Sequence, residues 1–132
     1  DHFKNVNDTY GHPVGDLVLK RLSSILKKEV VRDTDLPARY GGEEFAIICE
    51  GTDTEGAVQL AERIRKDFEK EVFQTAHGTL QVTISMGIAT YPVHARKKEE
   101  LIELADTALY AAKEGGRNQV RTWKKGMQKK SA

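Results

Sequence analysis

The chain has 132 residues, enough for one domain, and 39% of them are hydrophobic, enough for a single core. Its 21 Lys and Arg residues nearly balance its 20 Asp and Glu residues, so the formal net charge is +1. A near-neutral chain lacks the basic excess typical of nucleic-acid-binding proteins, and we expect no nucleic-acid partner.

Cysteine usage and hydropathy indicate a reducing, aqueous compartment. Cys49 is the only cysteine, which excludes an internal disulfide, and its apolar neighbours favour a buried, inert thiol over a nucleophile. The sequence contains neither a signal peptide nor a long apolar stretch. We expect a cytoplasmic domain, although a longer parent protein could still be tethered to a membrane.

Hydrophobic periodicity predicts helices interleaved with strands. Val18, Leu22 and Ile25 share one helical face, whereas Leu80 and Val82 begin an alternation typical of a strand with one buried face. In chain order we expect a loop at 5–15, a helix from 14 to 26, strands at 36–40 and 45–49, a helix at 57–68, a strand at 80–88, a helix at 101–112 and a strand at 119–122. This order predicts an α/β (α+β) sandwich with helices packed on a mixed sheet.

Two glycines and two acids lie between the two central strands. Gly41 and Gly42 suit the turn of a hairpin, which puts Glu43 and Glu44 at its tip. One interpretation is a solvated acidic turn. The other is a divalent-cation site, because hard cations such as Mg²⁺ prefer carboxylate oxygens together with phosphate and water. Taken alone, so short a motif favours the solvated turn.

Six motifs follow one another along nearly the whole chain. They are FKNVNDTYGH at 3–12, GD at 15–16, RYGGEEF at 39–45, VTISMG at 82–87, ADTALYAAK at 105–113 and GRN at 116–118. In order and spacing they resemble the GGDEF family of diguanylate cyclases, in its GGEEF variant. The resemblance implies a palm-like nucleotide-cyclase fold and an enzyme that condenses two GTP molecules into cyclic di-GMP and pyrophosphate.

The resemblance gives the metal and catalytic roles to the two signature acids. Glu43 occupies the catalytic and metal-binding position, and Glu44 is the second acid, which supports metal or nucleotide. Two Mg²⁺ or Mn²⁺ ions per active site are implied. The family has a further metal-ligating acid two positions before Asp1, on a strand that this sequence does not include. Asp1 matches a neighbouring acid and receives no metal role.

Asn7 and Asp16 match the guanine-recognition pair of the family. Guanine offers N1–H and 2-amino donors to a carboxylate, whereas adenine would leave Asp16 unpaired, so an adenylate cyclase is disfavoured. Without the resemblance, a turn-forming Asn and a helix-capping Asp are the simpler interpretations.

Three cations match positions that contact the triphosphate: Lys4, Lys113 and Arg117. Phe3 lies beside Lys4 in the same phosphate-proximal segment. Taken singly, Lys113 is an ordinary favourable charge at a helix end. His12 either borders the nucleotide or is a structural histidine.

Arg32 and Asp35 reproduce the RxxD product-inhibition motif of the family, and Arg63 matches its secondary inhibitory position. Arg32 offers a planar fork to phosphate or guanine, and Asp35 offers acceptors. The local alternative is a solvated Arg–Asp pair at a turn.

The resemblance also implies how the domain is organised and assembled. One cyclic di-GMP requires two GTP molecules face to face, so a homodimer is expected, controlled by an upstream sensor or receiver domain. We expect the domain at residues 1–123, without the opening strand of the family fold, and a basic tail at 124–132. The alternative function is an inactive GGDEF module that binds GTP or cyclic di-GMP, which the intact signature disfavours.

Overall fold

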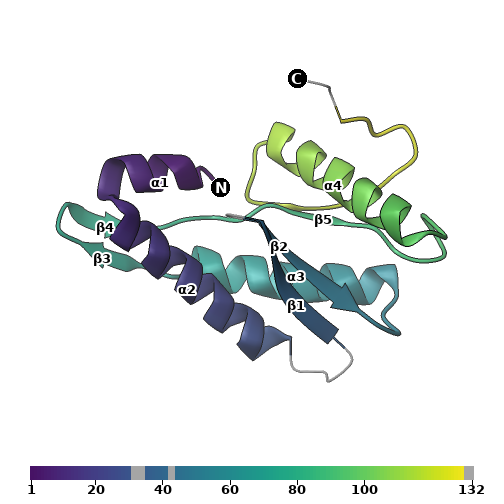
Figure 1. Cartoon of the computed structure of the whole chain (residues 1–132), viewed down its shortest axis with the longest axis horizontal. Coiled ribbons are helices and arrows are strands. Elements are labelled where there is room, and N and C mark those ends of the chain that lie inside the picture. Colours follow the sequence, from purple (N-terminus) through teal and green to yellow (C-terminus); the bar gives the residue numbers. More distant parts are fainter. Residues whose placement is uncertain (31–34, 42–43, 130–132) are drawn as a thin grey trace.

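The structure is a computed structural model and describes residues 1–30, 35–41 and 44–129. Its elements in chain order are α1 (Phe3–Tyr10), α2 (His12–Glu29), β1 (Asp35–Gly41), β2 (Glu44–Cys49), α3 (Thr54–Glu69), β3 (Phe73–Thr75), β4 (Gly78–Leu80), β5 (Met86–Ile88), α4 (Lys98–Glu114) and β6 (Val120–Thr122). Helices and strands are interleaved (Figure 1), which confirms the expected α+β fold. Across the described residues, no helix is long and apolar enough to cross a membrane.

The N-terminal segment is helical, so the loop expected at 5–15 is wrong. Helix α1 forms because Val6 and Tyr10, four residues apart, both pack toward the core, and Val6 is only 6% exposed. Gly11, with φ 91°, separates the two helices, and α2 begins directly after it with Pro13 in its first turn. Packing of this apolar face outweighs the turn-forming composition of the segment.

Strands β1 and β2 form the antiparallel hairpin that the sequence predicts. The register pairs Leu36 with Ile48, and these two side chains stay 58% and 56% exposed. The opposite face of β2 carries Phe45, Ile47 and Cys49, which pack against the core. Cys49 is half-buried there, rather than fully buried as expected.

The strand expected at 80–88 is interrupted. Strand β4 ends at Leu80 and β5 begins at Met86, and residues 81–85 pair with no other strand in the described part of the chain. The predicted alternation is still present, since Val82 is buried. A strand requires a ladder partner as well as a pattern of side chains, and periodicity reports only the pattern.

The strands form three two-stranded pairs across the described ranges. The pairs β1–β2 and β3–β4 are antiparallel and β5–β6 is parallel, so both pairing modes of the expected mixed sheet occur. The short β3–β4 hairpin was not predicted. Gly78, at φ 110° where the hairpin turns, is the signal that indicates it.

The core lies where α1, α2 and α3 meet the inner face of β2. Phe68 packs edge-on against Phe73 with ring centroids 6.4 Å apart, and both side chains are 1% exposed. The buried members of the core are Val6, Val18, Leu22, Ile25, Leu26, Leu60, Ile64, Phe68, Phe73 and Val82. Because residues from all three helices share one core, the position of α1 is set by its packing on α2.

Helix α4 packs directly on β5 at Gly87. A Cβ atom on Gly87 would lie 2.2 Å from the carbonyl oxygen of Ala105 and 2.3 Å from the nitrogen of Leu109. Only glycine allows the helix backbone to come so close to the strand. This contact fixes where the C-terminal end of α4, which carries Lys113, lies relative to the β5–β6 pair.

Truncation of Ile64 should destabilise the domain far more than the same truncation at Ile102. Ile64 on α3 is 0% exposed and Ile102 on α4 is 42% exposed. We expect Ile64→Ala to lower the free energy of unfolding by about 2–5 kcal/mol. The matched Ile102→Ala should cost about 1 kcal/mol or less. Chemical denaturation measures both losses, and equal losses would contradict this assignment of the core.

Candidate functional site

Several of the elements that carry predicted site residues lie near the N-terminus of the chain. In Figure 1 the start of α1, the Glu44 end of β2 and the C-terminal end of α4 all lie near it. The Asn118 N–H, just beyond α4, donates to Asp1 Oδ2 over 3.1 Å. The Lys129 ammonium donates a hydrogen bond to Asp106 of α4, which raises the pKa of Lys129, and the charge of Glu44 adds to that effect. The first of these hydrogen bonds joins the end of α4 to the N-terminus, and the second joins α4 to the tail.

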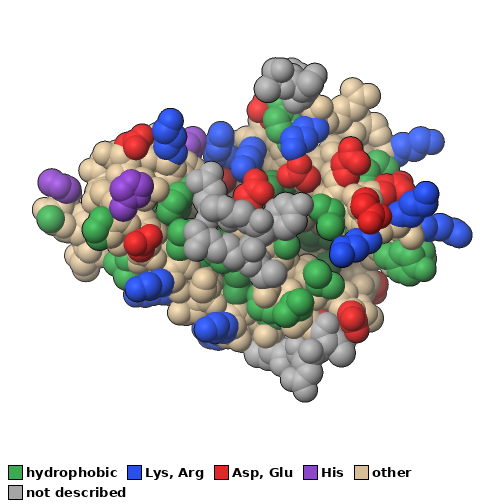
Figure 2. Space-filling view, viewed as in Figure 1, with side chains coloured by type: hydrophobic (Ala, Val, Ile, Leu, Met, Phe, Trp, Pro, Cys, Tyr) green, Lys and Arg blue, Asp and Glu red, His purple; other side chains and the backbone are tan. Residues whose placement is uncertain are grey.

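Basic side chains gather in the gap between α1 and α4 (Figure 2). The elements that border this gap carry the three predicted phosphate ligands. Lys4 lies in the first turn of α1, Lys113 in the last turn of α4, and Arg117 three residues after that helix. A helix C-terminus carries partial negative charge, which favours cations and disfavours anions. An anion bound here would therefore depend on these side chains and not on the helix end.

Helix α4 ends in a Schellman motif that turns Arg117 back toward the helix. Gly116, with φ 116°, donates its N–H to the carbonyl of Lys113 over 3.5 Å. The N–H of Arg117 donates to the carbonyl of Ala112 over 3.0 Å. The predicted helix end at the glycine pair is confirmed, and these two bonds keep Arg117 within a turn of Lys113.

The turn continues with two non-glycine residues in the left-handed region. Arg117 has φ 62° and Asn118 has φ 45°. A left-handed backbone costs an L-residue about 1–2 kcal/mol, and less for Asn, whose short polar side chain tolerates it. Such a turn persists only where surrounding contacts hold it in place.

The carboxylate of Asp1 supplies one set of these contacts. Asp1 Oδ2 accepts hydrogen bonds from the Asn118 N–H and from Thr83 Oγ1, the latter over 2.8 Å, and Asp1 Oδ1 accepts one from Ser85 Oγ over 2.8 Å. The backbone nitrogen of Asp1 donates to the Thr83 carbonyl over 2.8 Å. These bonds fasten the turn after α4 to the segment between β4 and β5.

The side chain of Asn118 is held from α3. Arg65 Nη1 donates to Asn118 Oδ1 over 3.0 Å, and Asn118 Nδ2 donates to Glu69. Arg65, whose side chain is 14% exposed, also donates from Nε and Nη2 to the two carboxylate oxygens of Glu62 over 3.2 and 3.0 Å. This two-pronged hydrogen bond lowers the pKa of Glu62 and raises the pKa of Arg65.

Asn7 and Asp16 lie on adjacent helices. Asn7 is inside α1 and Asp16 is exposed in the second turn of α2, so neither is the turn former or the helix cap of the simpler interpretations. The Oδ1 atom of Asn7 is buried and has no hydrogen-bond partner in the described part of the chain. It faces Gly15, where a Cβ would lie 1.8 Å away. A buried acceptor of this kind suits a ligand with N–H donors.

Phe3 lies beside this pair, and His12 opens α2. Phe3 is half-buried, and its Cζ atom would lie 3.2 Å from a Cβ on Gly15, so its ring borders the same place as Asn7. His12 is exposed at the first residue of α2, and its part in nucleotide binding stays a prediction.

The structure describes only the second of the two signature acids. Glu43 lies outside the described residues, so its catalytic and metal roles stay predictions. Glu44 opens β2 opposite Gly41 and is exposed. In the ranges that the structure describes, no three His, Cys, Asp or Glu side chains cluster as metal ligands would. Exposed carboxylate oxygens are the donors that Mg²⁺ prefers, so Glu44 fits the expected ion as one ligand.

Of the three predicted inhibitory residues, the structure describes Asp35 and Arg63. Arg32 falls outside the described residues, and Asp35 is half-buried as the first residue of that strand. Arg63 is exposed on α3, and its Nε donates over 3.1 Å to Glu29, which ends α2 three residues before Arg32 in sequence. Arg63 therefore lies close to the chain that leads into the motif, and product binding there stays a prediction.

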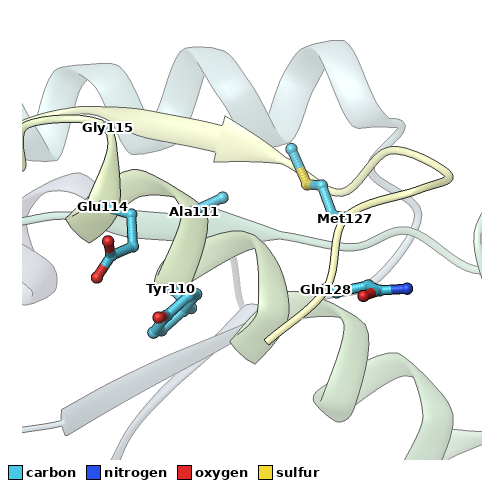
Figure 3. A pocket seen from close by; sticks show the side chains of 6 residues that line it. All are labelled: Tyr110, Ala111, Glu114, Gly115, Met127 and Gln128. Atoms are coloured by element: carbon cyan, nitrogen blue, oxygen red, sulfur yellow. The ribbon is translucent and has the colours of Figure 1, made fainter. Parts of the chain in front are cut away.

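A hollow of about 450 Å³ separates the last turns of α4 from the tail (Figure 3). It is lined by Tyr110, Ala111, Glu114, Gly115, Met127 and Gln128. The tail is tied to α4 by the ion pair of Lys129 with Asp106. The lining residues are all different from the predicted site residues, but Glu114 and Gly115 lie between Lys113 and Arg117 in the sequence. The expected domain boundary at residue 123 stays a prediction.

Sequence reasoning gave no role to Asp1, Arg65 or Asn118, which together hold the turn after α4. Asn118 did carry a signal, because Asn is one of the few residues that tolerate the left-handed region. Arg65 carried none, since its partner Asn118 lies 53 residues away in the sequence.

Comparison with known proteins decides the family. The family described as "Diguanylate cyclase, GGDEF domain" matches residues 1–119. The chain belongs to the GGDEF diguanylate cyclase family. Diguanylate cyclase A of Treponema denticola is 42% identical to this GGDEF chain over 129 residues, and the response regulator PleD of Caulobacter vibrioides is 44% identical over 122 residues. These matches cover 98% and 91% of this chain but only 34% and 27% of the two relatives.

Solved structures of GGDEF domains are similar to this chain in fold as well as in sequence. The GGDEF domain of DgcB from Caulobacter crescentus, in complex with c-di-GMP, superimposes with a TM-score of 0.84 at 36% identity, covering 92% of this chain and 70% of that one. The active GGEEF domain of a diguanylate cyclase from Vibrio cholerae gives a TM-score of 0.83 at 32% identity, covering 96% and 79%. Agreement in sequence and in fold makes this a GGDEF domain of the enzyme family.

The Arg65–Glu62 pair should make stability depend on pH. Because the pKa of Glu62 is lower in the folded state, its contribution is present above the unfolded pKa, near 4.5, and is lost as pH falls through the folded value. Glu62→Gln should therefore lower the free energy of unfolding at pH 7 and have little effect near pH 3. Urea denaturation at the two pH values measures this.

The matched control acts on the partner of Glu62. Arg65→Gln removes the donor and should return the pKa of Glu62 toward its ordinary value, followed by NMR titration of its carboxyl group. An unchanged pKa would contradict Arg65 as the cause of the shift.

Proposed function

We propose that this GGDEF domain condenses two GTP molecules into cyclic di-GMP and releases pyrophosphate. The observation that carries the proposal is the hydrogen bond between Asn118 and Asp1. It joins the turn beyond Lys113, which carries Arg117, to the residues that lead into α1, the helix that carries Lys4 and Asn7. A cationic region beside unpaired acceptors suits a triphosphate joined to a base with N–H donors. Relatives named diguanylate cyclases support the same reaction.

The reaction forms one phosphodiester bond for each GTP consumed. The ribose 3′-hydroxyl of one GTP loses its proton, which Glu43 would help to remove, and its oxygen attacks the α-phosphate of the other. The bond to the β-phosphate breaks, and pyrophosphate leaves with the electron pair. Lys4, Lys113 and Arg117 would hold the triphosphate and balance its charge, which is most of what such chemistry requires of a protein. Glu43 and Glu44 would hold Mg²⁺ or Mn²⁺, which supplies charge neutralisation at the phosphates when bound.

The Asn7 and Asp16 pair would select guanine. Asp16 Oδ atoms would accept the N1–H and 2-amino protons of the base, and the buried Asn7 Oδ1 would gain the donor that the described residues do not give it. Gly15 would keep Asn7 in this place, because any side chain there would displace the amide. Phe3 would close the same side of the site.

Catalysis would need two domains. Each domain is proposed to hold one GTP, and the product contains two linkages, so each nucleotide must face a partner on a second copy of the domain. A homodimer would bring the two sites together. The relatives are three to four times longer than the matched part, and a further domain in such a protein would control this encounter.

Replacement of Glu43 by Gln should abolish most activity. The substitution keeps the shape of the side chain but removes the charge proposed to hold the metal, so we expect turnover of GTP to fall about 100-fold or more. The assay is release of pyrophosphate by protein that carries the residues before Asp1. Glu55→Gln, an equal change at an exposed position of α3, is the matched control and should keep its activity. Near-normal turnover of Glu43→Gln would disprove the catalytic role.

Guanine selectivity should depend on Asp16. We expect GTP to bind at least tenfold more tightly than ATP, since ATP leaves the carboxylate unpaired, and Asp16→Ala should erode this ratio by weakening GTP alone. Calorimetric titration with both nucleotides measures it. Glu100→Ala, which removes an exposed carboxylate on α4, is a control for loss of charge alone. Equal affinities for ATP and GTP in the unmodified protein would rule out the assigned base site.

Product inhibition should depend on Arg32. If cyclic di-GMP binds at the RxxD motif, Arg32→Ala should raise the product concentration that halves activity by about tenfold, because a bidentate Arg contact is lost. Rates measured at increasing cyclic di-GMP give this concentration. Arg63→Ala should raise it less, and Arg96→Ala, an exposed arginine before α4, should leave it unchanged. Unaltered inhibition of Arg32→Ala would place the inhibitory site elsewhere.

A further inference from the structure

Asn118 lies where three distant parts of the GGDEF domain meet. Its backbone N–H donates to Asp1, its Oδ1 accepts from Arg65 and its Nδ2 donates to Glu69. The partners lie 117, 53 and 49 residues away in sequence. Most side-chain hydrogen bonds in proteins go to backbone or water. Three contacts with charged side chains at one loop residue therefore hold that residue in a specific position.

These contacts add to the two Schellman hydrogen bonds in holding a backbone conformation that L-residues disfavour. Arg117 and Asn118 are consecutive left-handed residues at φ 62° and 45°. A non-glycine residue released from such a conformation moves to the extended or right-handed region. For Arg117, that change would redirect its side chain, which is exposed and begins within one helical turn of Lys113.

We propose that Asn118 is a positioning residue which, clamped by Asp1 and Arg65, holds Arg117 in the orientation that meets the triphosphate beside Lys113. The inference rests on the proposed function and adds to it the cause of the placement of Arg117. A side chain already oriented loses less conformational freedom when it binds, so the clamp would strengthen triphosphate binding without touching the ligand.

A double-mutant cycle tests whether Asn118 acts through Arg117. Asn118→Gly removes the side-chain contacts to Arg65 and Glu69 but leaves a residue that tolerates positive φ, so the fold should survive. GTP affinity is measured by calorimetry with Mg²⁺ for the unmodified protein, Arg117→Ala, Asn118→Gly and the double variant. Arg96→Ala, an exposed arginine before α4, controls for loss of charge.

We expect Arg117→Ala to weaken GTP binding about tenfold or more, and Asn118→Gly several-fold. The double variant should bind within about twofold of Arg117→Ala alone, because both changes disable the same contact. Losses that multiply in the double variant would overturn the inference. Unchanged GTP affinity in Arg117→Ala itself would overturn both the inference and the assigned phosphate role.

Two further measurements separate positioning from general support of the fold. Guanosine, which has no phosphate, should bind Asn118→Gly as it binds the unmodified protein in an NMR titration, and an equal loss of guanosine and GTP affinity would overturn the proposal. Arg65→Lys keeps the charge but removes the fork that reaches Asn118 and Glu62, and it is the second variant should Asn118→Gly fail to fold. In a double-mutant cycle of Arg65→Lys with Arg117→Ala, the double variant should again bind GTP about as well as Arg117→Ala alone. Losses of GTP affinity that multiply in this double variant would overturn the proposal.

Discussion

The carboxylate of Asp1 is the contact on which the assembly of the site depends. Its oxygens receive hydrogen bonds from Thr83, Ser85 and Asn118, which lie 82, 84 and 117 residues away along the chain. Bonds to a charged acceptor are shorter and stronger than neutral ones, and partial burial strengthens them further. One acid residue thereby joins the start of α1, the segment before β5 and the turn after α4. The first and the last of these carry the candidate phosphate ligands Lys4 and Arg117.

Close approach at two glycines sets the positions of the helices around this contact. At Gly15 the helices α1 and α2 leave no room for a Cβ next to Asn7, and at Gly87 the helix α4 rests on β5 in the same way. The apolar core adds the driving force, since α1, α2 and α3 bury their faces together. The candidate site is therefore built on packed elements, whose relative positions change little, and its residues gain their geometry from the core beneath them.

The phosphate side of the site works against two local preferences of the chain. A helix C-terminus disfavours anions. The turn after α4 is also unfavourable, because two successive non-glycine residues in it are left-handed. The domain offsets the first with Lys113 and Arg117 and the second with the Arg65, Glu69 and Asp1 contacts to Asn118. A local arrangement that opposes intrinsic preference and is held by distant contacts is typical of functional sites. In this GGDEF domain the exposed candidate ligand Arg117 and the half-buried Asn118 are neighbours in sequence but have different partners.

The sequence by itself determined the helices α2, α3 and α4, the β1–β2 hairpin and the family motifs, because periodicity and turn residues are local properties. It did not determine α1, since Val6 and Tyr10 are set among residues that favour turns, nor the break at 81–85, since a ladder depends on its partner strand. Only the tertiary structure decided that Asn7 Oδ1 faces Gly15 and that Asp1 and Arg65 hold Asn118. Contacts between residues so far apart in the chain leave no periodic signal, because they arise only when the core has brought the elements together.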